Sequence, residues 1–487
     1  MNNELLKLNP ERLWYYFSEI LGIPRPSKKE EKIAQYLQDF GKTHKLETLI
    51  DEAGNILIRK PATKGFEKKM PVVLQSHIDM VCEKNSDKVH DFDHDPIEAW
   101  ISDGWVKAKG TTLGADDGIG IAAQLAILES ETIQHGPVEC LFTIDEETGL
   151  TGAFGLKSGF LHGKFLLNLD SEDEGELFIG CAGGKDTTAT IKYTGETVPE
   201  GWTTYRIDVF GLLGGHSGED INKGRGNANK LLNRILSYSS EHFGIRLSVF
   251  DGGNLRNAIA REAFAIICVQ SIKEKDFLKY VQECEEIFKS EFKVTEPNLK
   301  ISISKTEKAS YLIDKDSQAK VLDAVYACPH GVIALSAEIP GLVETSTNLA
   351  SVKTFSDHIV VTTSQRSSVE SAKEDICNMV VSVFNLAGGQ TEQSSGYPGW
   401  TPDPNSRIVS ITRQTYKDMF QIEPKVLAIH AGLECGLIGN VYPEMEMISF
   451  GPTIKGAHSP DERLQIDSVK KFWDLTIEVL KRIPEEQ

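Results

Sequence analysis

The chain has 487 residues, enough for about two to four domains, and its 40% hydrophobic and 25% charged residues are ordinary for a globular protein. Its 52 basic and 71 acidic residues give a formal net charge of −19. That charge argues against nucleic acid or an anionic membrane as a partner, because both would repel the protein. The sequence has no secretory leader pattern and no apolar stretch of the roughly 18 residues that span a bilayer. We therefore predict a soluble, cytoplasmic protein.

The 8 cysteines are scattered along the chain, and none forms a Cys-x-x-Cys pair. This spacing argues against a zinc ribbon or a thioredoxin-type site. The cysteines are also too sparse for a disulfide scaffold, so we predict reduced and mostly buried thiols.

The N-terminal part of the chain is predicted to begin with two helices. Apolar residues recur with a helical period over residues 11–23. Ser27, followed three residues later by Glu30, is a capping-box pattern that predicts a second helix ending near His44.

Strands then alternate with helices. Continuous apolar runs predict strands at residues 71–76, 138–143 and 164–169, and a helix that is apolar on most faces at residues 118–129. Fully apolar strands between buried helices are typical of an α/β domain with a mostly parallel sheet flanked by helices.

The pattern changes near residue 185. Segments such as 187–193 and 204–209 alternate apolar and polar residues, as antiparallel strands with one solvated face do. Long helices are predicted between them, at residues 227–240 and 275–291. We predict an inserted α+β domain over residues 186–397, and a first domain made of residues 1–185 and 398–487.

Several strands of the first domain end in side chains that bind metals. His77 and Asp79 follow one strand, Asp116 lies in a glycine-rich turn, Glu146 and Glu147 follow a second strand, and Asp170 follows a third. Ligands of open α/β sheets bind beyond the carboxyl ends of the strands, so we expect these loops to meet there. A single acidic loop is usually only solvated, but several loops at one end of a sheet indicate a site.

Two pairs within this set have a specific chemical logic. Residues two apart on an extended segment point the same way, so Asp79 can bind the far ring nitrogen of His77 and orient it toward a metal. Adjacent side chains in a turn diverge, so one of Glu146 and Glu147 can bind a metal while the other takes a proton. Two further loop histidines, His430 and His458, are candidate ligands. Histidine with carboxylates suits zinc, manganese or cobalt.

Together these motifs resemble the aminoacyl-histidine dipeptidase family of di-zinc peptidases, over essentially the whole chain. The resemblance is carried by five segments, at residues 74–81, 110–120, 168–172, 430–436 and 456–462. It implies a zinc-peptidase-like catalytic domain with an inserted lid domain. It also implies hydrolysis of Xaa-His (carnosine-like) and other short dipeptides by a metal-bridging hydroxide, with Glu146 as general base.

The resemblance also implies a role for each ligand. His77, Asp116 and Asp170 would hold one divalent ion, and Asp116, Glu147 and His458 the other, so that Asp116 bridges them. The ions would most readily be zinc, with cobalt or manganese as alternatives. Asp79 would orient His77, and the peptide bond after Asp116 would be cis.

In the lid, the resemblance implies that His216, Asn257 and Arg366 contact the substrate, with Arg366 clamping its carboxylate. Gly432 would join them from the C-terminal part. A homodimer through the lid is implied as well, and it stays open whether His216 acts in its own subunit or in a partner's.

Two alternatives stay open. The same fold and metal pair would suit an N-acyl-amino-acid amidohydrolase. A non-catalytic binding relative is disfavoured, because Glu146 and every ligand named above are present.

Overall fold

The computed structural model describes residues 4–486 and divides the chain into two compact units. Unit 1 comprises residues 1–181, 400–428 and 433–487, and unit 2 comprises residues 182–399 and 429–432. The division places residues 429–432, which the sequence analysis assigned to the catalytic part, in unit 2. Each unit has its own sheet and its own core.

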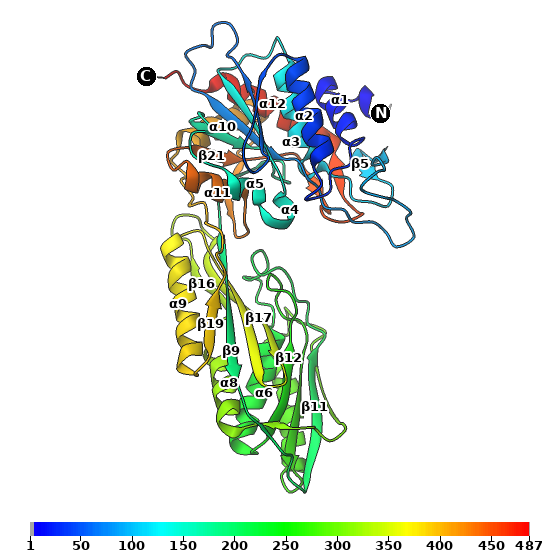
Figure 1. Ribbon diagram of the computed structural model, residues 1–487, viewed down its shortest axis with the longest axis vertical. Coiled ribbons are helices and arrows are strands. Elements are labelled where there is room, and N and C mark those ends of the chain that lie inside the picture. The colour runs from blue at the N-terminus through cyan, green and yellow to red at the C-terminus, as the bar shows by residue number, and fades with distance from the viewer. Residues whose placement is uncertain (1–3, 487) are drawn as a thin grey trace. The chain divides into compact units, whose positions relative to one another are not determined.

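Unit 1 is a three-layer α/β structure, which confirms the predicted fold class (Figure 1). Its helices are α1 (Glu11–Ile20), α2 (Glu31–Thr43), α3 (Ala115–Glu129), α4 (Glu146–Gly149), α5 (Thr151–Gly155), α10 (Arg407–Phe420), α11 (Glu434–Val441) and α12 (Ile466–Arg482), after a 3-10 turn at Leu5–Lys7. The strands of its main sheet are β1 (Glu47–Ile50), β2 (Ile56–Lys60), β3 (Val72–His77), β6 (Val138–Thr143), β7 (Phe165–Asn168), β8 (Glu176–Cys181), β20 (Lys425–Ile429) and β21 (Glu446–Ser449). A smaller sheet contains β4 (Ala99–Ser102), β5 (Trp105–Ala108), β22 (Ile454–Lys455) and β23 (Arg463–Gln465).

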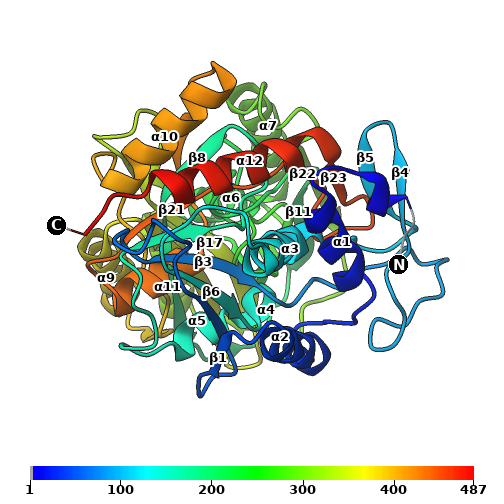
Figure 2. The ribbon, with the colours of Figure 1, turned by 90° about the horizontal axis from the view of Figure 1, so that it is seen from above.

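The main sheet has the strand order β1-β2-β6-β3-β7-β21-β8-β20. The four central strands β6, β3, β7 and β21 run parallel, and β2 and β8 add to them antiparallel. Strands β3, β6 and β7 are buried along their whole length. In Figure 2, α10 and α12 lie on one side of these strands and α5 and α11 on the other. Cover on both faces is why the central strands are continuously apolar.

Unit 2 is an α+β structure with helices on one face of an antiparallel sheet. Its sheet has the order β14-β11-β13-β12-β17-β18-β9-β19, and β16 pairs with β17. These strands are β9 (Gly183–Lys192), β11 (Trp202–Phe210), β12 (Arg246–Gly252), β13 (Ala263–Gln270), β14 (Lys300–Lys305), β16 (Gly331–Leu335), β17 (Val343–Thr354), β18 (His358–Ser367) and β19 (Gln390–Gln393). The remaining elements are the pair β10 (Gly195–Glu196) and β15 (Leu312–Ile313) and the helices α6 (Ala228–His242), α7 (Glu274–Glu291), α8 (Lys315–Ala327) and α9 (Glu370–Leu386).

Beside a small separate cluster of Ile221, Ile259 and Val343, unit 2 has one large core. It joins apolar residues from all four helices, such as Leu232 of α6 and Phe277 of α7, to one face of the sheet. The strands therefore alternate buried and exposed residues, as β11 does, which is the alternation that the sequence analysis used.

The predicted capping box at Ser27 is wrong. Helix α2 begins at Glu31, because the two side chains that would have capped an earlier turn have other partners. The Ser27 hydroxyl donates to Asp79 Oδ2 at 2.8 Å. Glu30 Oε1 accepts from the backbone of Lys28 at 2.9 Å and of Asp145 at 3.0 Å. Asp79 follows β3 and Asp145 follows β6, so both are remote in sequence from Ser27 and Glu30. The local pattern could therefore not reveal these partners.

The predicted burial of the cysteines is confirmed. Of the eight cysteines, all free, seven are buried and Cys82 is partly buried. No helix among residues 4–486 is sufficiently long and apolar to cross a bilayer.

Lys60, at the end of β2, caps the C-terminus of α3. Its ammonium group donates to the carbonyls of Ile127 at 2.9 Å and Leu128 at 3.0 Å, and also to that of Ser130. Lys60→Met leaves these carbonyls without their charged donor. We expect the free energy of unfolding to fall by about 1–3 kcal/mol, measured by urea denaturation.

The control is Lys64→Met, a change at an exposed lysine of the following loop. It should alter the free energy of unfolding by less than about 0.5 kcal/mol. Equal stability of the two variants would show that the cap contributes nothing.

Candidate metal centre and substrate-binding residues

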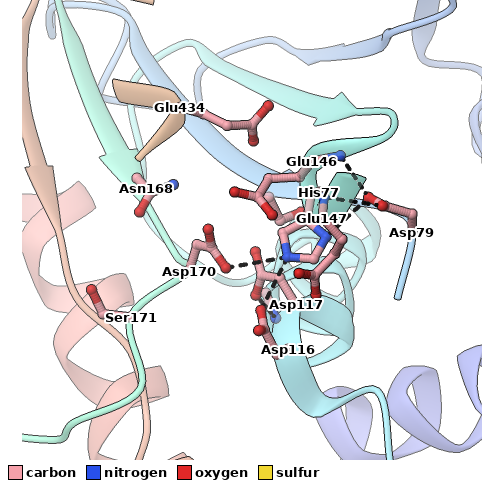
Figure 3. Close-up of polar contacts among 12 residues, drawn as sticks. His77, Asp79, Asp116, Asp117, Glu146, Glu147, Asn168, Asp170, Ser171 and Glu434 are labelled. Carbon is pink, nitrogen blue, oxygen red and sulfur yellow. Dashed lines mark hydrogen bonds and ion pairs between the residues drawn. The ribbon is translucent and has the colours of Figure 1, made fainter. Parts of the chain in front are cut away.

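The predicted ligands meet at the carboxyl end of the central strands of unit 1. His77 is the last residue of β3, Asp170 follows β7, and Glu146 and Glu147 form the first turn of α4 after β6. Because β6, β3 and β7 are adjacent and parallel, their following loops converge (Figure 3). The sheet therefore explains why side chains almost a hundred residues apart lie together.

The structure brings these side chains into two groups of possible metal ligands. His77, Asp116 and Asp170 form one group, and Asp116, Glu147 and His458 form the other; within each, the ligand atoms lie within 4.8 Å of one another. Asp116 belongs to both. Its Oδ1 lies 3.0 Å from His77 Nε2 and its Oδ2 lies 3.1 Å from His458 Nε2. One carboxylate thus faces two sets of donors, which is the arrangement that a pair of bridged ions needs.

Asp116 sits at an irregular start of α3. The peptide bond between Asp116 and Asp117 is cis, as predicted, and both residues have non-helical backbone angles. Asp117 Oδ1 instead accepts from the backbone of Gly120 at 3.1 Å. The two neighbouring aspartates therefore have different tasks.

Asp79 lies beside the far ring nitrogen of His77, the position from which the sequence analysis expects it to orient the ring. Its Oδ1 lies 3.2 Å from His77 Nδ1, and both side chains are buried. Asp79 also has a task that the sequence analysis missed, because it accepts from the backbone of Glu146 at 3.0 Å and of Glu147 at 3.3 Å. One carboxylate thus contacts the imidazole and accepts hydrogen bonds from the backbone of the acidic turn.

The charges of this centre are unbalanced without a cation. Burial raises the pKa of Glu146 and of Asp170 well above their ordinary values, and neighbouring carboxylates add to the effect. Against the effect of burial, hydrogen bonds with His458 and His77 hold the pKa of Asp116 below its ordinary range. Divalent cations would neutralise such a cluster, so the residues present fit a metal pair.

Glu146 lies close enough to be considered as a ligand too. With His77 and Glu147 it forms a third group within 4.8 Å. Glu147 Oε1 is buried and lacks a hydrogen-bond partner among the described residues, as a ligand atom would in the absence of its ion. Both carboxylates of this turn therefore reach the ligand atoms of the centre.

Glu434 and Glu462 make buried contacts at the centre that the sequence analysis missed. Glu434, in the first turn of α11, is fully buried and accepts from Gln75 Nε2 at 2.6 Å and Thr143 Oγ1 at 2.7 Å. Burial raises the pKa of Glu434 to about 7, and Figure 3 shows this side chain on the same side of the centre as Glu146. The second, Glu462, accepts from the backbone of Ala115, next to Asp116, at 2.7 Å.

The predicted substrate-binding residues gather in unit 2. The segment of His216 pairs with that of Asn257, since Ser217 N donates to Asn257 O at 2.8 Å. Arg366 is buried at the end of β18, and its Nε lies 3.4 Å from Ser217 Oγ. The Asn257 side chain itself is exposed.

Tyr397 connects Arg366 to Gly432. Arg366 Nη1 donates to Tyr397 Oη at 2.9 Å. A Cβ atom at Gly432 would lie only 2.9 Å from the ring of Tyr397, so a side chain there would displace the tyrosine. The sequence offered no signal for Tyr397, which stands in a Gly-Pro-rich stretch.

His430, the second loop histidine, lies in unit 2 and belongs to none of the metal groups of the described residues. Its Nε2 is 2.7 Å from Ser346 Oγ. Burial, together with the positive charge of Arg366, lowers the pKa of His430 to about 3, and His216 adds to the effect. His430 is therefore neutral in the folded protein.

This neutral state predicts a pH dependence of stability. The unfolded chain protonates histidine near pH 6.5, whereas folded His430 protonates only near pH 3, so stability falls as the pH drops below about 6.5. Between about pH 7.5 and about pH 5, the wild type should lose about 2 kcal/mol more than His430→Gln in urea denaturation. The same pH dependence in both proteins would contradict the assignment.

Comparisons with known proteins agree with one another. The model of peptidase family M20/M25/M40 matches residues 73–482. The chain is 46% identical over 485 residues to the cytosol non-specific dipeptidase of Escherichia coli K12, with 99% of both chains covered. A crystal structure of aminoacylhistidine dipeptidase from Vibrio alginolyticus matches with a TM-score of 0.93 and 45% identity, over 99% of each chain. A tripeptidase structure from Staphylococcus aureus, at 17% identity and a TM-score of 0.57 over 98% of this chain and 99% of that one, shares the fold.

Proposed function

Because the chain belongs to peptidase family M20/M25/M40, we propose that it is a metal-dependent dipeptidase that hydrolyses Xaa-His and other short dipeptides. The observation that carries the proposal is the pair of ligand groups that share Asp116 beside Glu146. The two relatives at 46% and 45% identity, both named as dipeptidases, support the substrate class. The name of the first relative also supports a cytoplasmic location.

Two divalent metal ions would occupy the centre. His77, Asp116 and Asp170 would hold one ion, and Asp116, Glu147 and His458 would hold the other. One imidazole and carboxylate oxygens at each position suit zinc, with cobalt or manganese as alternatives. When bound, the metals supply a Lewis acid for the scissile carbonyl and lower the pKa of the attacking water.

The protein's own residues move the proton. Glu146 takes a proton from the attacking water and later gives it to the leaving amine, as a general base and then a general acid. Its half-buried position and raised pKa suit a group that must hold a proton between the two steps. Asp79 keeps Glu146 in place through the backbone of the turn and keeps the His77 ring oriented.

Unit 2 is proposed as the lid that recognises the substrate. Arg366 binds the terminal carboxylate of the dipeptide, because a guanidinium can hold a carboxylate through two hydrogen bonds. His216, Asn257 and the backbone at Gly432 complete the contacts. We also propose a homodimer formed through unit 2.

Three forms of one peptide test this proposal: a free Xaa-His dipeptide, its N-acetyl derivative and its C-terminal amide. A dipeptidase that binds the terminal carboxylate should cleave the free dipeptide faster than the N-acetyl form and faster than the amide. In the Arg366→Gln variant, the ratio of the cleavage rates of the free dipeptide and the amide should be smaller than in the wild type. Faster cleavage of the N-acetyl form would instead identify an N-acyl-amino-acid amidohydrolase. Equal cleavage of the free peptide and the amide by the wild type would contradict the role of Arg366.

A further inference from the structure

Arg25 is a buried cation that joins two of the ligand-bearing loops. Its side chain is 2% exposed, although it lies in the segment between α1 and α2. The guanidinium donates to the carbonyl oxygen of Ile78 at 3.1 Å, and also to those of Asp79 and Gly114. A buried charge is costly unless it is well bonded, so these carbonyls are held firmly in place.

Glu462 holds the same loop through its backbone amides. The carboxylate is 3% exposed and accepts from the backbone of Leu113 at 2.7 Å, Gly114 at 3.0 Å and Ala115 at 2.7 Å. Hydrogen bonds to a charged acceptor are about twice as strong as neutral ones. Glu462 also stands four residues after His458, so it ties the His458 loop to the loop of Asp116.

Gly114 lies between the two charged groups. Its φ of +69° is a left-handed conformation that glycine adopts without strain. A Cβ atom at this position would lie 2.8 Å from Arg25 Nη2 and 2.9 Å from Met80 Sδ. The backbone therefore fits closely against the guanidinium, with a carbonyl bonded to Arg25 and an amide bonded to Glu462.

We infer that Arg25 and Glu462 form a clamp on Gly114 that positions Asp116, and that this clamp sets the affinity for the metal pair. The clamp joins the loops that carry His77, Asp116 and His458, and these ligands contribute to both groups. Neither Arg25 nor Glu462 belongs to a ligand group, so both are positioning residues. The inference rests on the proposed metal pair.

Metal affinity is the direct readout. Glu462→Gln keeps the shape of the side chain but removes the charge, and Arg25→Lys keeps the charge but removes the planar fork. Each variant of the full chain should bind zinc about 10–100-fold more weakly, measured by competition with a chromogenic chelator. At saturating zinc, the turnover number of Glu462→Gln should return to within about threefold of the wild type, because the ligands and the base are intact.

Glu139→Gln is the matched control. Glu139 is also buried and accepts from two backbone amides, of His162 at 2.7 Å and Gly163 at 2.8 Å, but it stands at the amino end of β6, away from the ligands. The Glu139→Gln variant should have a lower free energy of unfolding than the wild type but the same affinity for zinc.

Three outcomes would overturn the inference or its premise. Zinc affinity of Glu462→Gln and Arg25→Lys equal to that of Glu139→Gln would reduce the clamp to a structural role. If Glu462→Gln does not fold, a zinc affinity of Arg25→Lys equal to that of the wild type would by itself show that the clamp has only a structural role. A wild-type chain that binds fewer than two zinc ions would contradict the proposed function, and the clamp with it.

Discussion

Glu146→Gln is expected to keep both metal ions and to lose about 10²–10⁴-fold of the turnover number on a dipeptide, the usual contribution of a general base. The amide has nearly the same shape as the carboxylate, and the backbone of residue 146 still bonds to Asp79. The turn that carries Glu147 should therefore stay in place. Steady-state kinetics with metal analysis of the same preparation measures both quantities.

The metal content decides between the two roles that the geometry allows for Glu146, since it lies within 4.8 Å of ligand atoms of His77 and Glu147. A loss of one ion with the loss of rate would make Glu146 a ligand. Near-normal turnover would contradict the assignment altogether. Glu139→Gln, at the other end of β6, should leave both rate and metal content unchanged.

Asp116→Asn is expected to have the second large effect, loss of both metal ions and of nearly all activity. Asp116 faces His77 with one oxygen and His458 with the other, so no other residue replaces it in either group. An amide offers one neutral oxygen in place of two charged ones. Because loss of a group that merely orients a ligand costs 10–100-fold in affinity, we expect a loss of about 100-fold or more, measured by calorimetric titration with zinc.

The neighbouring change Asp117→Asn is the control. The Asp117 carboxyl is buried, its pKa is raised chiefly by burial, and it accepts from Gly120 within α3. It should therefore tolerate a neutral amide and keep both ions. Equal zinc affinity in Asp116→Asn and Asp117→Asn would contradict the bridging role.

Much of the centre could be predicted, because the patterns that indicate it span only a few residues or repeat along a strand. The spacing of His77 and Asp79 on an extended segment and the adjacent Glu146 and Glu147 each carry meaning within a few residues. The apolar runs of β3, β6 and β7 then place these loops at one end of a sheet. The assignment of ligands to individual ions, and the cis bond after Asp116, depended on the family resemblance instead.

The residues that escaped prediction act through contacts remote in sequence. Glu462 bonds to Leu113, 349 residues away along the chain, and Arg25 bonds to Gly114, 89 residues away. The Ser27 cap failed for the same reason, since its hydroxyl bonds to Asp79 at a separation of 52 residues. A local pattern contains no information about such partners, whereas the folded sheet brings them together.

The most direct test of the central claim is hydrolysis of carnosine and a small panel of free dipeptides, followed by released amino acid. The protein is first stripped with a chelator and then restored with zinc, manganese or cobalt. We expect no release of amino acid by the stripped protein, and restored release from Xaa-His dipeptides after metal is added. Full activity in the stripped protein, or no cleavage of any free dipeptide with two ions bound, would contradict it.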